Sequence, residues 1–401
     1  MPKTLNVALI GSKFMGRTHS NAYLNVAKFF DVPITPVMHT IAARDAEDLA
    51  KFAPRWGWLK FTTRWQDVCE DENIGLVDVG TPNHLHAEQA ISALEAGKHV
   101  ACEKPLAGTL DDARQMVEAA KAARKSKTFV WYNYRRVPAV AFAHQLVNEG
   151  KLGRIYHVRA AYLQDWGGPE TPLSWRFKGK EAGSGAHGDL NAHVIDMARF
   201  VTGDEITEVV GAIEETFIKK REIVESAGGE ISGKGSKKSS KKRFGRSTVD
   251  DAVLFLARFK KGAVATFEAT RLSTGDKNAN RLEIHGEKGA IRFNFERMNE
   301  IEWYDNTLPD KMQGWSTINV TRGDGTANGH PYVGNWWPAS HIIGYEHGFV
   351  NQAADMMSVI AKKKPVVPVC DFADAYQTQR VLHAAIESAR NRCPVPLSEV
   401  K

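Results

Sequence analysis

The sequence predicts two fold classes in one chain, an N-terminal α/β domain with a parallel sheet and a C-terminal α+β domain built on an open, mostly antiparallel β-sheet. In the first 125 or so residues, short apolar segments alternate with helical ones, which is typical of βαβ units. From residue 155 onward, segments of alternating polarity follow one another, which indicates an antiparallel sheet with one covered face. A length of 401 residues is sufficient for two such domains.

Apolar runs and turn residues place the elements of the first half. We expect strands at residues 5–10, 37–43, 76–79, 98–102 and 129–134. We expect helices at residues 16–30, 111–124 and 137–149, and one that follows the turn 81–83 and stops at Gly97, where a left-handed cap suits glycine. The first domain is therefore expected to span residues 1–135.

The second half is expected to form one domain, residues 136–401. Its strands are predicted at residues 156–163, 205–216, 251–259, 263–271, 281–284 and 290–295. The turns at 259–262 and 286–289 predict hairpins between consecutive strands. Helical periodicity returns at residues 344–361 and 371–389, which we expect to close the domain.

The positive charge of the chain is local. The net charge is +6, and residues 231–246 alone hold seven basic side chains, Lys234, Lys237, Lys238, Lys241, Lys242, Arg243 and Arg246. Subtracting these seven charges from +6 leaves −1 for the rest of the chain. A Ser/Gly/Lys run is typical of a solvated, mobile insertion, here about residues 226–248, and the alternative is contact with a polyanion or membrane. Phe244 is the single aromatic residue of the run, which is not the aromatic interleaving typical of base stacking, so we expect no nucleic-acid partner.

Cysteine usage and the N-terminus predict a cytoplasmic protein. Cys69, Cys102, Cys370 and Cys393 contain no close pair, which favours a reducing compartment over a disulfide framework or a zinc ribbon. The first apolar segment runs directly into Gly11, so we expect neither a cleavable leader nor a membrane span.

A glycine turn follows the first strand. Residues 11–16 are Gly11, Ser12, Lys13, Phe14, Met15 and Gly16, in the position where backbone amides and a helix dipole hold the pyrophosphate of a dinucleotide in Rossmann domains. Lys13 replaces the middle glycine of the usual fingerprint. Either its side chain turns outward, or its ammonium neutralises phosphate.

The residues after the second strand bear on the choice between NAD and NADP. Arg44 and Asp45 stand where a carboxylate usually accepts the ribose hydroxyls of NAD. Arg44 suits the adenine ring or a 2′-phosphate, and Asp45 is within reach of the ribose in sequence. The alternative is that both residues simply begin the next helix. These residues therefore leave both NAD and NADP open, and the predicted cofactor is NAD.

Two places in the sequence suit the oxidation of an alcohol. Glu103 and Lys104 end a parallel strand, at the edge where α/β sheets bind ligands. Asp189 and His193 are four residues apart around the start of a predicted helix at 190–201, so they are expected to share one face. Lys104 suits a cation that polarises the alcohol oxygen, and His193, with an ordinary pKa near 6.5, suits a base. An unremarkable surface pair is the alternative for Asp189 and His193, and no metal site is expected because His84/His86 and His341/His347 lack a third ligand.

These motifs together resemble the glucose-fructose oxidoreductase, inositol dehydrogenase and rhizopine-catabolism family (Gfo/Idh/MocA). The resemblance spans nearly the whole chain, through the glycine turn, Thr81-Pro82-Asn83 with His86, the stretch 96–105, and Asp189 with His193. Within the family, the stretches 134–138, 162–166, 173–176, 267–271, 336–338 and 344–347 are similar to levoglucosan dehydrogenases and related sugar 3-dehydrogenases.

The resemblance implies the roles of individual residues. Lys104 would polarise the alcohol, His193 would act as base, and Asp189 would bind a substrate hydroxyl, while Trp175 and Arg176 would lie near the nicotinamide. The full expected cofactor set is Gly11, Lys13, Phe14, Met15, Gly16, Arg44, Thr81, Pro82, Asn83, His86, Glu103, Lys104, Trp175 and Arg176. The expected substrate set is Lys104, Tyr134, Asp165, Asp189, His193, Tyr332, Trp336 and His341. The resemblance also implies a homodimer or homotetramer formed through the exposed face of the second sheet.

The predicted reaction is the NAD(P)-dependent oxidation of a secondary hydroxyl, at C3 of a pyranose or anhydrosugar. Residues His330, Tyr332, Trp336, Trp337 and His341 share one loop, and aromatic faces suit the C–H faces of a sugar. The alternative for this loop is that its tryptophans seal sheet and helix together. Two other functions stay open, a transient oxidation that drives glycoside elimination with retained NAD, and a catalytically silent dinucleotide sensor.

Overall fold

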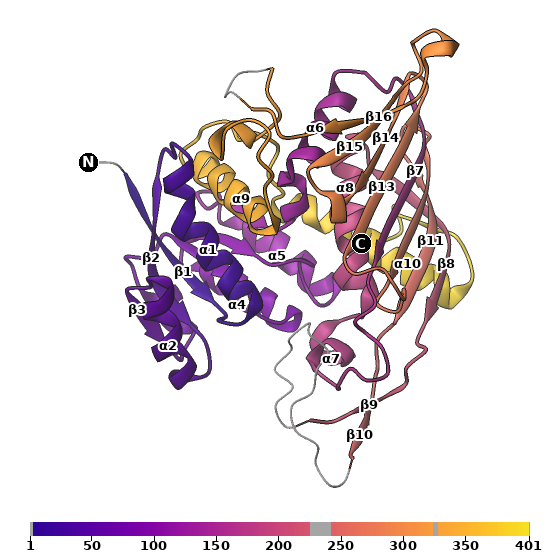
Figure 1. Cartoon of the computed structure of the whole chain (residues 1–401). Coiled ribbons are helices and arrows are strands. Elements are labelled where there is room, and N and C mark those ends of the chain that lie inside the picture. Colours follow the sequence, from indigo (N-terminus) through magenta and orange to yellow (C-terminus); the bar gives the residue numbers. More distant parts are fainter. Residues whose placement is uncertain (1–2, 225–241, 324–327, 401) are drawn as a thin grey trace. The chain divides into compact units, whose positions relative to one another are not determined.

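The computed structural model describes residues 3–224, 242–323 and 328–400. The chain forms two compact units (Figure 1), residues 1–138 with 321–376 and residues 139–320 with 377–401. The sequence predicted one continuous second domain from residue 136. The structure instead returns residues 321–376 to the first unit, where helix α9 (Tyr345–Ile360) packs against helix α1 (Phe14–Phe29).

The first unit contains a six-stranded parallel sheet in the order β3-β2-β1-β4-β5-β6. Its strands are β1 (Thr4–Ile10), β2 (Thr35–Ala42), β3 (Lys60–Thr62), β4 (Leu76–Val79), β5 (His99–Cys102) and β6 (Thr128–Val130). Its other helices are α2 (Ala46–Trp56), α3 (Gln66–Glu70), α4 (His86–Glu95) and α5 (Leu110–Ala122). This is the strand order of a Rossmann domain, which confirms the predicted fold class.

The strand order reverses between β1 and β4, and such a switch point is where open α/β sheets bind ligands. Val7, Ala8 and Leu9 of β1 are fully buried, because helices cover both faces of a parallel sheet. The apolar run that predicted this strand is therefore a consequence of burial on both sides. Gly11 and Gly80 follow the two central strands directly.

The second unit is built on a nine-stranded sheet in the order β16-β15-β14-β13-β7-β12-β11-β8-β17. The strands are β7 (Ile155–Leu163), β8 (Ile206–Glu215), β11 (Ala252–Phe259), β12 (Val264–Thr270), β13 (Ala279–Gly286), β14 (Gly289–Asn294), β15 (Glu300–Asp305), β16 (Trp315–Asn319) and β17 (Val395–Pro396). All neighbouring pairs are antiparallel except β12 with β7. The mostly antiparallel sheet of the prediction is confirmed.

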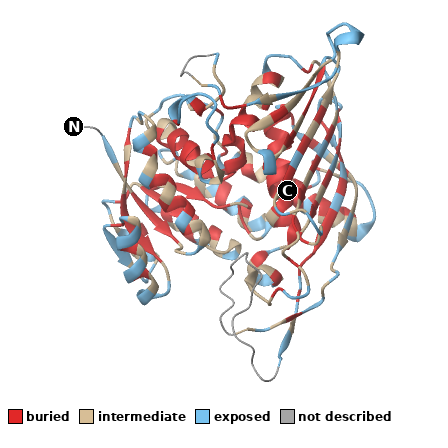
Figure 2. Cartoon of the chain, viewed as in Figure 1, coloured by how far each residue is buried: buried red, intermediate tan, exposed pale blue. Residues whose placement is uncertain are grey.

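One face of this sheet is covered and the other is open. Burial alternates along β11, with Val253, Phe255 and Ala257 buried and Leu254 and Leu256 exposed, as the bands of Figure 2 show. Helix α8 (Ala192–Thr202) packs against β7 and β13 on the covered face. The other helices of the second unit's segments are α6 (Pro138–Asn148), α7 (Gly179–Ala182) and α10 (Phe372–Asn391), of which α10 begins in the first unit.

Three local predictions differ from the structure. The strand expected at 129–134 ends at Val130 and is followed by a 3₁₀ turn, Asn133–Arg136, since the chain leaves the sheet there. The helix expected at 190–201 is preceded by a π-helical turn, His187–Asn191. Of the basic insertion, residues 225–241 lie outside the described residues, while Phe244–Arg246 forms β10, paired with β9 (Lys220–Glu222).

Candidate functional site

The glycine turn of the first unit has the backbone that a pyrophosphate requires. Gly11 has a φ of +119°, and a Cβ atom there would lie 2.6 Å from the carbonyl oxygen of Gly80. A Cβ at Gly16 would collide with the backbone of Gly11. No side chain caps the N-terminus of α1, so its first amides are available to bind an anion. The turn therefore fits the dinucleotide that its sequence predicted.

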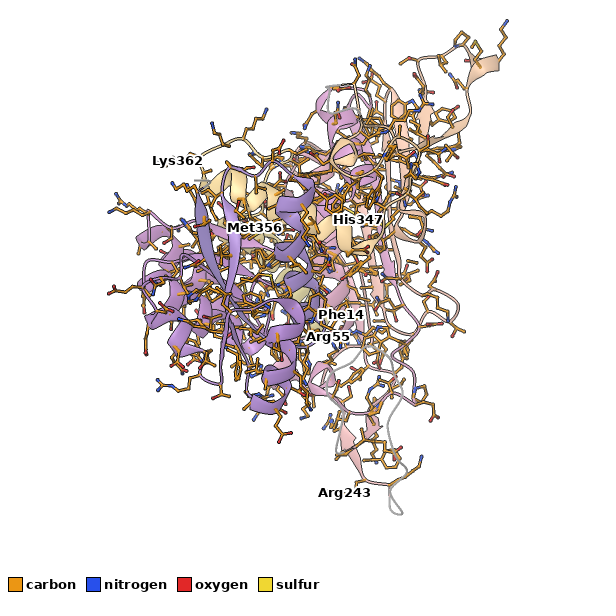
Figure 3. All side chains as sticks on the ribbon, turned by 60° about the vertical axis from the view of Figure 1, so that its left-hand side comes forward. Phe14, Arg55, Arg243, His347, Met356 and Lys362 are labelled. Carbon is orange, nitrogen blue, oxygen red and sulfur yellow. The ribbon has the colours of Figure 1, made fainter. Side chains whose placement is uncertain are left out.

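Lys13 turns outward from this turn. Its Nζ atom lies 2.5 Å from Oδ2 of Asp48, and its side chain is 69% exposed. The hydrogen bond and the charge of Lys13 lower the pKa of Asp48. The structure thus favours the first of the two hypotheses for Lys13. Phe14, labelled in Figure 3, stacks on Tyr345 at 6.3 Å between ring centroids, and Met15 is half-buried beside it in the chain.

Asp45 is used locally, as the cap of helix α2. Its Oδ1 atom accepts a hydrogen bond of 3.0 Å from the amide of Asp48. This favours the alternative in which Asp45 begins the next helix. Arg44 is exposed at the end of β2, and its contact with adenine or phosphate stays a prediction.

His86 connects two loops at the carboxyl edge of the first sheet. One ring nitrogen lies 2.9 Å from the carbonyl oxygen of Thr81, and the other lies 3.1 Å from that of Pro105. The imidazole is fully buried, and burial lowers its pKa. The Thr81 hydroxyl also donates to the side chain of Gln89 at 2.7 Å, so the loop that contains Pro82 and Asn83 is anchored to helix α4. The geometry gives His86 a supporting position behind that loop.

Glu103 and Lys104 follow β5 on the same edge. Glu103 is buried, and its Oε2 atom accepts a 3.1 Å hydrogen bond from the amide of Lys104, while Oε1 bonds to His19 at 3.0 Å. Lys104 is half-buried and its bond to Pro105 is cis. Tyr134, expected to contact substrate, is buried in the 3₁₀ turn that follows β6.

In the second unit, the turn that carries Asp189 is capped by Asp250. The two carboxylate oxygens of Asp250 accept 2.7 Å hydrogen bonds from the amides of Gly185 and His187. Asn191 lies 2.9 Å from the ring of His187 and donates to the carbonyl oxygen of Val253 at 3.1 Å. A π-helical turn of this kind is often found at functional sites. Sequence periodicity missed it because the departure from a regular helix depends on these distant partners.

Two arginines approach Asp189. Nη2 of Arg271 lies 2.7 Å from its Oδ2 atom, and Nη1 of Arg176 lies 3.9 Å from the same oxygen. Arg271 is 3% exposed, and its guanidinium lies 5.0 Å from the centre of the Trp166 ring. The guanidinium of Arg176 lies 4.7 Å from the ring of Trp175. Arg271 was absent from the predicted site, and its one signal in the sequence was its place in the family-like stretch 267–271.

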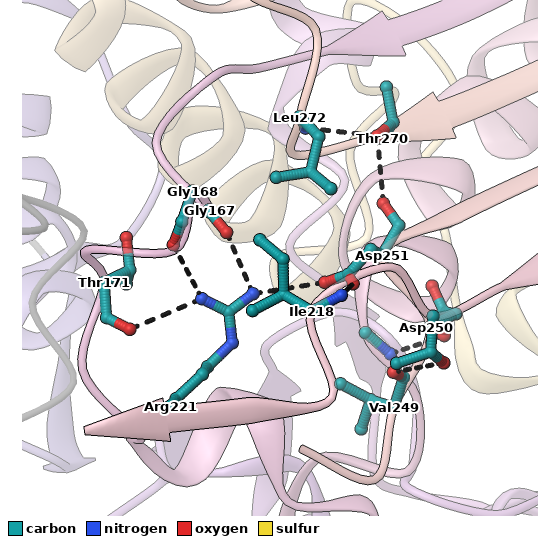
Figure 4. Close-up of polar contacts among 12 residues, drawn as sticks. Gly167, Gly168, Thr171, Ile218, Arg221, Val249, Asp250, Asp251, Thr270 and Leu272 are labelled. Atoms are coloured by element: carbon teal, nitrogen blue, oxygen red, sulfur yellow. Dashed lines mark hydrogen bonds and ion pairs between the residues drawn. The ribbon is translucent and has the colours of Figure 1, made fainter. Parts of the chain in front are cut away.

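A buried arginine holds the loop that leads to Trp175 (Figure 4). Arg221 of β9 donates to the carbonyl oxygens of Gly167, Gly168 and Thr171 and pairs with Asp251 at 3.2 Å. Its guanidinium lies 3.7 Å from the centre of the Phe177 ring. Two adjacent carboxylates therefore have different structural roles. Asp250 caps the Asp189 turn, and Asp251 holds Arg221.

His193 is 6% exposed in helix α8, and its ring centroid lies 5.8 Å from that of Tyr162. The Tyr162 hydroxyl donates to Asn278 at 2.6 Å. Asp165, a predicted substrate residue, pairs at 2.6 Å with Lys277, the residue that precedes Asn278. The contacts that hold Asp189 and His193 therefore come from the second unit, and their roles toward substrate stay a prediction.

The aromatic loop favours the packing alternative. Tyr332 is buried and its hydroxyl donates to Asp355 at 2.6 Å. Trp336 packs on Phe29 at 4.5 Å between centroids and donates to Asn351 at 3.0 Å. These contacts hold the loop to the first unit. His341 is exposed, and its ring bonds to the carbonyl oxygen of Pro338 at 2.8 Å.

Within residues 3–224, 242–323 and 328–400, no three His, Cys, Asp or Glu side chains are grouped as metal ligands would be. In the same part of the chain, no helix is both long and apolar enough to span a bilayer.

Comparison with known families assigns the chain. The family described as "Oxidoreductase family, NAD-binding Rossmann fold" matches residues 5–134, and the one described as "GFO/IDH/MocA C-terminal domain" matches residues 140–292. The chain belongs to the Gfo/Idh/MocA family. A levoglucosan dehydrogenase of Pseudarthrobacter phenanthrenivorans is 40% identical over 405 residues, which cover 99% of each protein.

Solved structures agree with this assignment. An oxidoreductase domain protein from Kribbella flavida superposes with a TM-score of 0.90 at 45% identity, covering 98% of this chain and 99% of that one. A levoglucosan dehydrogenase in complex with NADH and levoglucosan has a TM-score of 0.88 at 39% identity, covering 99% and 100%. The predicted family, the enzyme class of oxidoreductase and the NAD-binding Rossmann fold are confirmed.

Proposed function

We propose that this Gfo/Idh/MocA protein is an NAD-dependent dehydrogenase that oxidises a secondary hydroxyl, at C3 of a pyranose or anhydrosugar. The observation that carries the proposal is the supported Asp189 turn. Asp250 and Arg271 hold a carboxylate in place one turn before His193, in a chain whose other unit has the NAD-binding fold. A carboxylate held in this way suits the hydroxyl groups of a sugar.

The proposed roles follow from the chemistry of each side chain. Lys104 stabilises the alcohol oxygen as it loses its proton, and His193 accepts that proton. Asp189 accepts a hydrogen bond from a second hydroxyl and so orients the ring. NAD⁺, when bound, supplies the acceptor for the hydride that leaves the carbon. Gly11 and Gly16 would hold its pyrophosphate, and Trp175 and Arg176 are proposed to lie near its nicotinamide.

The substrate class is supported by the relatives. One relative is a levoglucosan dehydrogenase, and another, a glucose-6-phosphate 3-dehydrogenase of Bacillus subtilis, is 22% identical over 98% of this chain. Both names describe sugars, and the second names oxidation at C3. The preference for NAD is supported by the structures of levoglucosan dehydrogenase with NADH.

We infer a homodimer or homotetramer formed through the open face of the second sheet. Exposed apolar residues gather there, with Ile213 64%, Leu254 38% and Leu256 52% exposed, around a hollow of about 740 Å³. Arginine and glutamate side chains line the same hollow, which suits a self-complementary contact. Sedimentation of the wild type and of Leu256→Glu tests this, since a monomeric wild type contradicts it. The cytoplasmic location stays a prediction.

The decisive experiment is the absorbance of NADH over a panel of sugars and anhydrosugars. We expect a saturable signal in the wild type, none in Lys104→Ala and a strong decrease in His193→Ala, with a less than additive loss in the double variant. Product analysis separates glycoside elimination, which consumes substrate without net NADH. Cofactor binding without turnover of any sugar would instead favour the sensor.

A further inference from the structure

A buried cluster of charged and aromatic side chains includes Glu103, the residue that precedes Lys104. It consists of His19, Tyr23, Asp78, Glu103 and Trp131, and is called the His19 cluster here. All five residues belong to the first unit, and none is more than 5% exposed. None of the roles proposed above uses His19, Asp78 or Trp131. Two carboxylates buried this deeply require either a cation or a proton.

His19 bridges the two carboxylates. Its Nε2 atom lies 3.0 Å from Oε1 of Glu103, and its Nδ1 atom lies 3.0 Å from Oδ2 of Asp78. The second contact is an ion pair rather than a well-aligned hydrogen bond. Asp78 accepts two further hydrogen bonds of 2.9 Å, from the hydroxyl of Tyr23 and from the indole N–H of Trp131.

The surroundings favour a charged imidazole. Burial by itself lowers the pKa of His19, but the charges of Asp78 and Glu103 and their close contacts with the ring outweigh burial and raise it to about 9. The ring also stacks on Trp131 at 4.2 Å between centroids with an angle of 23°, and a cation over an indole face is stabilised. A neutral ring could donate to only one of the two carboxylates and would carry no charge to balance them.

The position of the cluster connects two parts of the proposed site. His19 lies in the second turn of α1, the helix that begins at the glycine turn. Glu103 accepts the amide hydrogen of Lys104 through its other oxygen, at 3.1 Å. The chain of contacts therefore runs from the helix that would hold the pyrophosphate, through His19 and Glu103, to the backbone of Lys104.

We propose that His19, as an imidazolium held between Asp78 and Glu103, is a positioning residue that aligns Lys104 with the glycine turn. The inference rests on the proposed dehydrogenase function, because the purpose of the alignment is to present Lys104 to the substrate oxygen. His19 touches neither substrate nor cofactor in this role. It acts through Glu103, and its charge, more than its volume, matters.

The first test uses His19→Gln, with His99→Gln as the matched control. His99 begins β5, the strand whose far end carries Glu103, and its ring accepts one amide hydrogen bond, from Lys127. We expect His19→Gln to lower kcat by roughly tenfold to a hundredfold, because small displacements of a reacting group are costly, and to weaken NADH binding measured by fluorescence. His99→Gln should change neither. Equal behaviour of the two variants would overturn the inference.

A second variant separates charge from packing. His19→Gln combined with Asp78→Asn removes one carboxylate together with the cation. If charge balance is the role of His19, the double variant recovers kcat several-fold over His19→Gln. If His19 only fills space, the double variant is worse than the single one, and the proposal fails.

A third measurement needs no variant. In wild-type protein labelled with ¹⁵N-histidine, one imidazole should keep both ring protons at about pH 8. Absence of such a ring would exclude the imidazolium. The ¹⁵N-histidine measurement and the NADH binding of His19→Gln test the role of His19 even if no sugar reduces NAD⁺. That outcome would contradict only the proposed function.

Discussion

Two acidic clusters, one in each unit, are held by different cations. In the first unit, Asp78 and Glu103 share the imidazole of His19. In the second unit, Asp251 pairs with Arg221, and Asp189 pairs with Arg271. A guanidinium stays charged at every physiological pH, whereas an imidazolium loses its proton. The comparison teaches that pH acts on the support of Lys104, while the support of Asp189 is insensitive to it.

The largest expected effect is on the stability of the second unit. Replacing Arg221 by Met leaves Asp251 buried without its cation, which costs about 3–5 kcal/mol of unfolding free energy. Arg292→Met is the matched control, because Arg292 also pairs with a carboxylate, Glu283, and lies 3.9 Å from an aromatic centre, Trp315, but is 42% exposed. Its loss should cost about 1 kcal/mol or less. Urea titrations of both variants measure the difference, and similar losses would contradict the contrast between buried and exposed pairs.

The next effect distinguishes the two cations by pH. The pKa of His19 is raised to about 9 from an ordinary 6.5. Its stabilisation is therefore complete below about pH 6.5 and is lost as pH rises through 9. The unfolding free energy of the wild type should fall over this range by roughly 3 kcal/mol more than that of His19→Gln. Parallel curves for the two proteins would show that His19 is not the titrating group.

The third effect concerns the arginine at Asp189. Arg271→Lys keeps a charge but loses the planar fork, so the carboxylate is held less firmly. We expect KM for the sugar to rise by roughly tenfold, which corresponds to about 1.4 kcal/mol, with NADH binding unchanged. Steady-state kinetics and NADH fluorescence measure the two quantities. Weakened NADH binding with an unchanged KM would place Arg271 on the cofactor side instead.

The smallest effect is expected at Lys13. Its ion pair with Asp48 is exposed, and pairs of this kind contribute about 0–1 kcal/mol. Lys13→Gly should leave the affinity for NADH within about twofold of the wild type. A large decrease would show that the ammonium contacts phosphate after all. A clear increase would show that the Lys13 side chain crowds the turn.

Much of the first unit could be predicted from the sequence. Apolar runs bounded by Gly11 and Gly97 mark β1 and β5 because a parallel strand is buried on both faces.

In the second unit, the alternation of polarity in residues 251–259 marks β11 because only one face of that strand is covered. The edge strand β16 and its neighbour β15 were missed, since their sequences show little periodicity.

The candidate site was only partly predictable. Lys104, Asp189 and His193 were predicted because motif spacing and family resemblance can be recognised in short stretches of sequence. His19 and Arg271 were missed because their partners are distant, with His19 and Glu103 84 residues apart and Arg271 and Asp189 82 apart. Tyr332 and Trp336 are residue types that suit a sugar, so the sequence favoured neither sugar binding nor packing. Their buried contacts with Asp355 and Asn351 favour packing.

The sequence by itself therefore determined most of the main strands and helices and the glycine turn, since burial on one or two faces and backbone freedom at glycine act over a few residues. The tertiary structure decided which cation supports each carboxylate. It also decided that residues 321–376 return to the first unit. Charge and hydrogen-bond partners of buried groups depend on what the whole fold brings within about 3 Å, and periodicity along the chain does not encode that.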